Sequence, residues 1–177
     1  MKKEPPLLLL VICLAACMAV GATTTDTTQP KPLLPQLKEK KLTVETLIAN
    51  GSMVSSKKLN RQQLMSLSLK AIDKGFAPTL QYHLIDTLYR GNGHYILLLG
   101  QWYDFENKAW VASYATPHRL IDFRQVFYDN AEGFLSVETQ IKDNTISITT
   151  LNDYETGAAK RKTERLKFGT NYKLQKL

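Results

Sequence analysis

Cysteine is scarce in this chain of 177 residues, which contains only Cys13 and Cys17. The remaining 160 residues therefore form no disulfide, and they offer no thiolate for catalysis or for a zinc site. The sequence also lacks an HExxH motif, a GxSxG motif and a phosphate-binding loop. The stability of the folded part must consequently come from packing.

Long hydrophobic runs are missing as well. The main apolar run, residues 7–14, has eight residues, and its extension to residue 20 has only fourteen. A helix needs about 20 residues to cross a bilayer, and Pro5-Pro6 prevents the run from extending backwards as a helix. Because Lys2 and Lys3 precede the run and small residues follow it, the pattern predicts a secretory signal.

The run closes with Leu14-Ala15-Ala16-Cys17, an aliphatic residue, two small residues and a cysteine. This stretch resembles the lipobox of bacterial lipoproteins. The resemblance implies that the Cys17 thiol receives a diacylglyceryl group, that the signal is cut before Cys17, and that the new amino group is acylated. Such a lipid would hold the chain on a membrane without a spanning helix. The alternative is an ordinary signal, cleaved after Ala16, Ala19 or Ala22 to release a free protein.

The resemblance also bears on location. An aspartate after the lipidated cysteine retains such lipoproteins in the inner membrane, whereas Met18 stands at this position. We therefore expect an exported protein anchored in the outer membrane, facing the periplasm or the cell surface. The expected domains are a signal peptide at 1–16, a lipidated cysteine with a Thr/Pro-rich tether at 17–42, and one α+β domain at 43–177.

The net charge of +7 is unevenly distributed along the chain. Residues 18–74 carry +5, residues 75–157 carry −5, and residues 158–177 carry +6. An exported protein meets no nucleic acid in its own compartment, so a nucleic-acid partner is not expected. Basic ends suit anionic lipid headgroups or phosphorylated glycans. Solvated charge that keeps the protein soluble is the simpler alternative.

Two helices are expected before residue 78. Thr43 to Ala49 forms a short one that ends at Asn50-Gly51. The second runs from Asn60, as N-cap of a capping box with Gln63, to Lys74, and Gly75 follows as the C′ residue. Its apolar stripe should pack on a sheet, and the stripe comprises Met65, Leu69, Ile72 and Phe76, with Leu64, Leu67 and Ala71 beside it.

From Pro78 onward the apolar period changes to two, and short links separate the apolar segments, which is typical of antiparallel strands. The expected fold class is α+β, mostly β. It is an antiparallel meander of six to eight strands that forms a curved sheet or half-barrel, with one or two N-terminal helices packed on it. The expected strands are 79–90, 93–103, 108–115, 118–128, 133–141, 145–151, 165–168 and 171–177.

Two details of this sheet follow from the pattern. A two-residue turn at Asp143-Asn144 would place Ile141 opposite Ile146 and put the apolar residues of both strands on one face. The strand 94–103 is apolar on both faces, so it should be central, with the second helix covering one of them. A turn at Gly91-Asn92 would in addition place Tyr89 opposite His94.

Little in the sequence indicates catalysis. The three histidines are His83, His94 and His118, and the first two lie about 18 Å apart on the expected ladder, too far to share a metal. We therefore expect no metal, no cofactor and no enzymatic activity. A hydrolase with residues assembled from distant parts of the chain is the alternative.

Aromatic residues gather around the expected turn at Glu106-Asn107. Tyr103 should stand opposite Trp110 as a cross-strand pair. Such rings at a sheet rim would recognise a sugar, a peptide or a partner surface, unless they instead plug one end of the sheet. The candidate binding residues are Trp102, Tyr103, Phe105, Trp110 and Tyr114.

The sequence thus favours a membrane-anchored bacterial envelope lipoprotein with a non-enzymatic binding or scaffold domain. Its expected partners are the membrane, through the lipid, and an envelope protein or glycan. The alternative function is a carrier that holds a lipid or another apolar ligand inside the curved sheet.

Substitution of Cys17 tests the expected anchor. The mature wild-type protein should carry acyl groups on Cys17 and sediment with membranes, because two or more acyl chains anchor a protein stably. Cys17→Ser should abolish both the added mass in intact-protein mass spectrometry and the sedimentation. An unmodified Cys17 in the wild-type membrane fraction would contradict the expectation.

Overall fold

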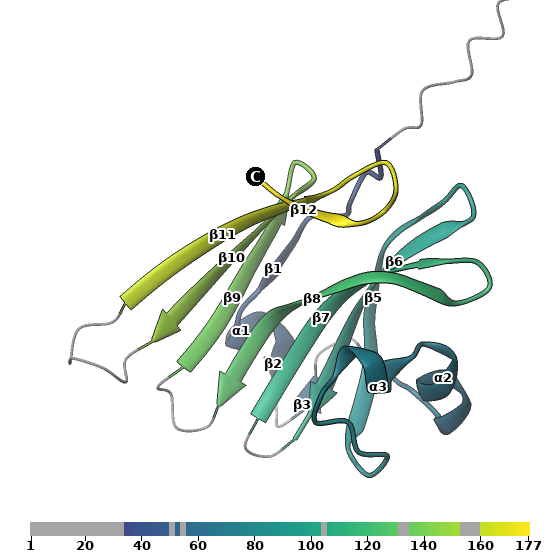
Figure 1. Ribbon diagram of the computed structural model, residues 1–177. Coiled ribbons are helices and arrows are strands. Elements are labelled where there is room, and N and C mark those ends of the chain that lie inside the picture. Colours follow the sequence, from purple (N-terminus) through teal and green to yellow (C-terminus); the bar gives the residue numbers. More distant parts are fainter. Residues whose placement is uncertain (1–33, 50–51, 54–55, 104–105, 131–134, 153–159) are drawn as a thin grey trace, which may run out of the picture. The chain divides into compact units, whose positions relative to one another are not determined.

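A computed structural model describes residues 34–49, 52–53, 56–103, 106–130, 135–152 and 160–177. These residues form a curved, ten-stranded antiparallel sheet, a separate two-stranded ribbon and three short helices (Figure 1). The expected fold class is confirmed, and the sheet does not close into a barrel. Its strands are β1 Lys40–Leu42, β4 Lys57–Lys58, β5 Gln81–Gly91, β6 His94–Trp102, β7 Glu106–Ala115, β8 Arg119–Asn130, β9 Leu135–Lys142, β10 Thr145–Asn152, β11 Lys160–Phe168 and β12 Leu174–Lys176.

Most of the sheet is a meander in which consecutive strands are neighbours, from β4 to β12. In the β9–β10 hairpin, Ile141 stands opposite Ile146 and Thr139 opposite Ile148, as the sequence predicts. Asp143 and Asn144 form the turn with positive φ angles of 49° and 59°. The turn chemistry and the apolar alternation thus select the same register.

Strand β1 joins the sheet outside the meander. It pairs with β9, with Leu42 opposite Thr139, and the side chain of Leu42 is fully buried. The backbone N–H of Lys38 donates to the carbonyl of Leu88 on β5, and the Lys40 ammonium lies 2.8 Å from the Asp86 carboxylate. Residues 40–42, which the sequence assigned to the tether, are therefore part of the folded sheet, and Lys38 is hydrogen-bonded to it.

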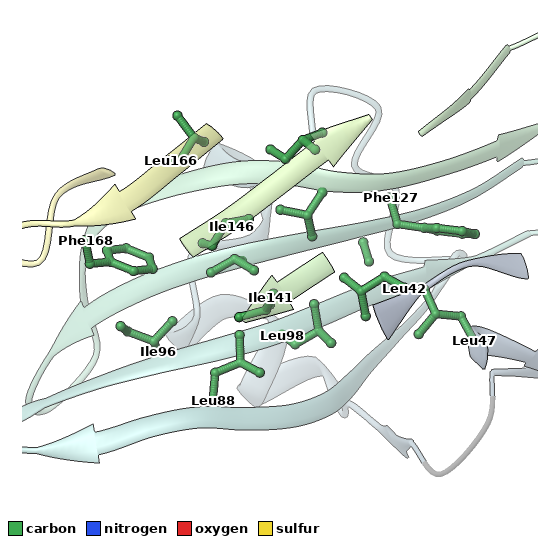
Figure 2. Packing of buried hydrophobic residues seen from close by; sticks show 14 of the residues in the cluster. Leu42, Leu47, Leu88, Ile96, Leu98, Phe127, Ile141, Ile146, Leu166 and Phe168 are labelled. Carbon is green, nitrogen blue, oxygen red and sulfur yellow. The ribbon is translucent and has the colours of Figure 1, made fainter. Parts of the chain in front are cut away.

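Strand β6 is buried on both faces, which confirms the prediction for this segment. On the inner face, Ile96 and Leu98 belong to a large apolar cluster (Figure 2). On the outer face, Tyr95, Leu97 and Leu99 belong to a second cluster, which includes residues from the helices. The inner cluster is contributed by β1 and helix α1 (Val44–Leu47) as well as by the meander strands, and its members include Leu42, Leu47, Leu88, Phe127, Ile141, Ile146, Leu166 and Phe168.

The outer face is covered by helices α2 (Arg61–Ser66) and α3 (Leu69–Ile72). The predicted capping box is confirmed, because the Gln63 N–H donates to the Asn60 side chain at 2.9 Å and the Asn60 N–H donates to the Gln63 side chain at 2.9 Å. The expectation of one continuous helix to Lys74 is wrong. Ser68 has a φ of 55°, and this left-handed residue separates the two helices.

The break changes which side chains are buried. Met65 was expected in the packed stripe, but its side chain is 71% exposed. The stripe requires an unbroken helix, and the break at Ser68 means that Met65 and Leu69 no longer lie on one continuous helix face. Leu69 and Ile72 still reach the sheet from α3. Gly75 is not the C′ residue, since α3 already ends at its C-cap Asp73. Similarly, the helix expected over 43–49 is limited to Val44–Leu47, and Ile48–Ala49 (β2) pairs with Ser52–Met53 (β3).

Among the described residues, no helix has the length and apolar character that a bilayer crossing requires.

The capping box should make a measurable contribution to stability. Asn60→Ala should lower the free energy of unfolding by about 1 kcal/mol, because the N–H of Gln63 loses its acceptor. Asn60→Asp retains an acceptor and should leave stability close to that of the wild type. Urea unfolding monitored by circular dichroism measures both variants. Equal losses in the two variants would contradict the role assigned to the cap.

Candidate functional site

The candidate site is a groove of about 540 Å³ on the outer face of the sheet. It lies between helix α2, the tip of the β5–β6 hairpin and the turn between β7 and β8. A concave, largely apolar surface with a few polar groups is the usual form of a ligand site. The following residues line the groove: Leu59, Gln63, Ser66, Leu67, Leu84, Thr87, Arg90, Gly91, Asn92, Gly93, His94, Tyr95, Leu97, Thr116, Pro117 and His118.

Strand β6 supplies the floor through Tyr95 and Leu97, which are 8% and 5% exposed. Their partners on β5 are Arg90 and Thr87. Because cross-strand partners share a face of the sheet, these β5 side chains stand beside the floor. The floor is thus held by a strand that is buried on both faces.

Two β-bulges set which β5 residues reach the groove. The register shifts once between Leu84 and Asp86 and again between Thr87 and Tyr89. Each bulge adds one residue to β5, so Leu84, Thr87 and Arg90 share a face although they are three residues apart. The predicted pairing of Tyr89 with His94 is wrong, because Tyr89 faces Ile96 and the tight turn is at Asn92-Gly93.

Helix α2 and the residue before its cap form the opposite wall. Leu59 and Leu67 are buried, whereas Gln63 and Ser66 are partly exposed. The Ser66 hydroxyl donates to the carbonyl of Gln63 at 3.1 Å. The Tyr114 hydroxyl donates to the carbonyl of Leu67 at 2.9 Å and so fixes the end of this helix to β7. The wall is therefore anchored to the sheet beneath it.

The two turns at the end of the groove are joined to each other. The backbone N–H and the hydroxyl of Thr116 both donate to the carbonyl of Gly93, at 2.8 and 3.0 Å. The Tyr95 hydroxyl donates to the carbonyl of Pro117 at 3.3 Å and also bonds to Nδ1 of His118. These bonds hold a polar rim in place above an apolar floor.

The electrostatics of the groove are one-sided. Arg90, His94 and His118 lie on its rim, and none of the described residues that line it is Asp or Glu. Burial raises the pKa of the Tyr95 hydroxyl, and the neighbouring Arg90 acts in the opposite direction. Tyr95 therefore stays neutral at pH 7 and serves as a hydrogen-bonding group, while Arg90 supplies a permanent positive charge.

A second hollow, of about 720 Å³, lies between α3 and strands β7 to β11. Most of its charged groups are already partnered. Arg124 forms an ion pair with Glu164, and the Asp73 carboxylate accepts from the Tyr82 hydroxyl at 2.7 Å and from the Gly75 N–H at 3.0 Å. Most of its charged groups thus serve the fold, and this makes it the weaker candidate.

The aromatic residues predicted to bind a partner do not come together on one surface. Trp110 is 2% exposed and Tyr114 is fully buried, and both pack in the outer cluster beneath the helices. The predicted pairing of Tyr103 with Trp110 is wrong, because Trp110 faces Leu99. Trp102 is partly exposed and Tyr103 is 46% exposed. Phe105 lies outside the described residues, as does Cys17.

In the described part of the chain, the three histidines each bond to a different group. His83 bonds to the Ser56 hydroxyl at 2.8 Å, His94 to the carbonyl of Asn92 at 2.6 Å, and His118 to Tyr95. None of these three partners is a carboxylate. The described residues likewise contain no group of three or more His, Cys, Asp or Glu side chains arranged to hold a metal.

Comparison of the chain with protein-family models, with curated proteins and with solved structures gives no match. The support for the candidate site therefore comes only from the residues of this chain. The sequence did not predict that Arg90, Tyr95 and His118 lie close together in one groove. One signal could have found them: in a meander, the first and third turns lie at the same end of the sheet, so the β5–β6 and β7–β8 turns must be close together.

Truncation of Trp110 tests its place in the core. Trp110→Ala should reduce the free energy of unfolding by about 3–5 kcal/mol, because it leaves a large cavity. Met65→Ala, at an exposed position, should change it by no more than about 0.5 kcal/mol. Urea denaturation of both variants measures the difference. A loss below about 1 kcal/mol for Trp110→Ala would show that the ring is not packed as described.

Proposed function

We propose that the protein is a membrane-anchored lipoprotein of the bacterial cell envelope whose folded domain binds an envelope component without converting it. Two features support this proposal. The lipobox pattern ending at Cys17 supplies the anchor, with the outer membrane as the expected location. The groove between α2 and the hairpin tips supplies the binding surface.

The observation that carries the proposal is the construction of the groove. Its floor, formed by Tyr95 and Leu97, is largely apolar and is held on β6, while most of its polar groups lie on the α2 wall and at the hairpin tips. The rim groups are fixed by bonds such as those from Thr116 to Gly93. A preformed site of this kind loses little conformational entropy when a ligand enters, which favours binding.

The hydrogen bonds of the histidines favour binding over catalysis. A general base is usually oriented by a third group, most often a carboxylate, and the described partners of His83, His94 and His118 are Ser56, a backbone carbonyl and Tyr95. The Ser56 hydroxyl and His83 have the spacing of a nucleophile and its base, but among the described residues the other ring nitrogen of His83 is buried without a hydrogen-bond partner, so no third group orients the base as a hydrolase would need. The hydrogen bonds of His94 and His118, which line the groove, suit residues that position a ligand.

The second alternative, a carrier with its ligand inside the curved sheet, receives less support. The inner face holds a packed cluster that includes Leu98, Phe127 and Ile141, all less than 2% exposed (Figure 2). Strand β1 and helix α1 contribute Leu42 and Leu47 to the same cluster. A ligand there would have to displace core side chains, whereas the outer groove is already open.

Two tryptophan substitutions on the same helix test the proposal. Ser66 lines the groove, and Gln62 is exposed on α2 away from it. Ser66→Trp should fill the groove and remove the envelope component that co-purifies with wild-type protein extracted from membranes. Gln62→Trp should retain that component. Mass spectrometry of the extracts, normalised to protein, measures the amounts.

Circular dichroism and urea unfolding should first show that both tryptophan variants are folded. The proposal is contradicted if no envelope component co-purifies with the wild-type protein. It is contradicted equally if the Ser66→Trp and Gln62→Trp variants carry the same amount.

A further inference from the structure

We infer that the groove between α2 and the β5–β6 hairpin binds an amphipathic anion, a molecule with a carboxylate or phosphate head and an apolar chain. This inference rests on the proposed function and names the chemistry of the component bound. The charge of the rim, the apolar floor and the arrangement of the two along the groove are the observations that support it.

The first step is the charge of the rim. Arg90 is exposed, and no ion pair between described residues involves it. A carboxylate or phosphate can accept two parallel hydrogen bonds from a guanidinium, the strongest type of polar contact available at a surface. Because none of the described residues that line the groove is acidic, an anion would meet no carboxylate on its described walls.

The second step is the apolar floor. Leu59, Leu67 and Leu97 are at most 6% exposed and lie along the groove between α2 and β6, with Leu84 at its β5 side. The volume of about 540 Å³ falls within the range of about 300–1,000 Å³ typical of small-molecule sites. A free inorganic anion would leave this apolar surface unused, whereas an attached hydrocarbon chain would cover it.

The third step is the order of these groups along the groove. Arg90 stands opposite Tyr95, next to the hairpin tip, whereas Thr87 and Leu84 stand opposite Leu97 and Leu99, progressively further from that tip. The positive charge is therefore at one end of the groove and the leucines follow from it. The Tyr95 hydroxyl, joined to His118, lies at the charged end and can donate to a headgroup if it releases the carbonyl of Pro117. A head-and-tail molecule matches this polarity.

The test uses the mature chain carrying Cys17→Ser, so that no acyl chain of its own can enter the groove. Isothermal titration calorimetry compares dodecanoate and dodecyl phosphate with acetate and inorganic phosphate, and with two twelve-carbon controls, neutral monolaurin and cationic dodecylamine. All long-chain probes are kept below their micelle concentrations. The shorter octanoate measures the contribution of the chain.

Dodecanoate and dodecyl phosphate should bind, and acetate and inorganic phosphate should give no detectable heat. Dodecanoate should bind at least about tenfold more tightly than monolaurin or dodecylamine, because only an anion gains a charge-assisted bond to Arg90. Each methylene buried beyond octanoate should strengthen binding by up to about fourfold.

Two arginine substitutions distinguish a local effect from a general one. Arg90→Gln should weaken dodecanoate binding about tenfold or more and leave monolaurin binding unchanged. Arg161→Gln serves as the matched control, since Arg161 is also exposed but lies on β11 outside the groove. It should leave both affinities unchanged.

Three results would overturn the inference, and they differ in what they imply for the proposed function. If monolaurin or dodecylamine binds as tightly as dodecanoate, and Ser66→Trp abolishes this binding, the groove is a ligand site but does not select anions. If the long-chain probes do not bind but an envelope component still co-purifies with the wild-type protein and Ser66→Trp removes it, the inference fails and the proposed function stands. If Ser66→Trp leaves the binding of the long-chain probes intact, the groove is not the site and the proposed function fails as well.

Discussion

The fold depends on one constraint, the burial of both faces of strand β6. Ile96 and Leu98 point into one apolar cluster while Tyr95, Leu97 and Leu99 point into the other. A strand with apolar side chains on both faces is stable only if each face is covered. The N-terminal segment and the C-terminal strands meet this need on the inner face, and helices α2 and α3 meet it on the outer face (Figure 1).

The candidate groove follows from the way in which the outer face is covered. The two helices are six and four residues long, and the left-handed Ser68 turns the chain between them. Helices this short cover the middle of β6 but leave an open channel beside the hairpin tip, where Tyr95 and Leu97 form a floor. The same residues that hold the sheet together thus provide a rigid base for a ligand. The charge at the rim comes from Arg90, which stands opposite Tyr95 on this face next to the hairpin tip.

Much of this architecture could be predicted from the sequence, because it is encoded locally. The capping box at Asn60, the turn at Asp143-Asn144 and the apolar run on both faces of β6 each have a short-range physical cause. The rest could not be predicted, because it depends on tertiary context. Nothing in the alternation of β5 marks its bulges, and a left-handed Ser68 has no sequence signal comparable to a glycine. The sequence leaves two roles open for Trp110, a binding residue at the rim or a packed residue, and the cover provided by the helices places it in the outer cluster.

Native-state hydrogen exchange measured by NMR tests the central claim most directly. If β6 is the strand on which both clusters depend, the backbone amides of Ile96 to Leu99 and their partners on β7 should exchange only through global unfolding, and should be the slowest in the protein. Amides of β12 and of the hairpin tips should exchange much faster. The account is contradicted if the slowest amides lie in β9 to β11 while those of β6 exchange through local opening.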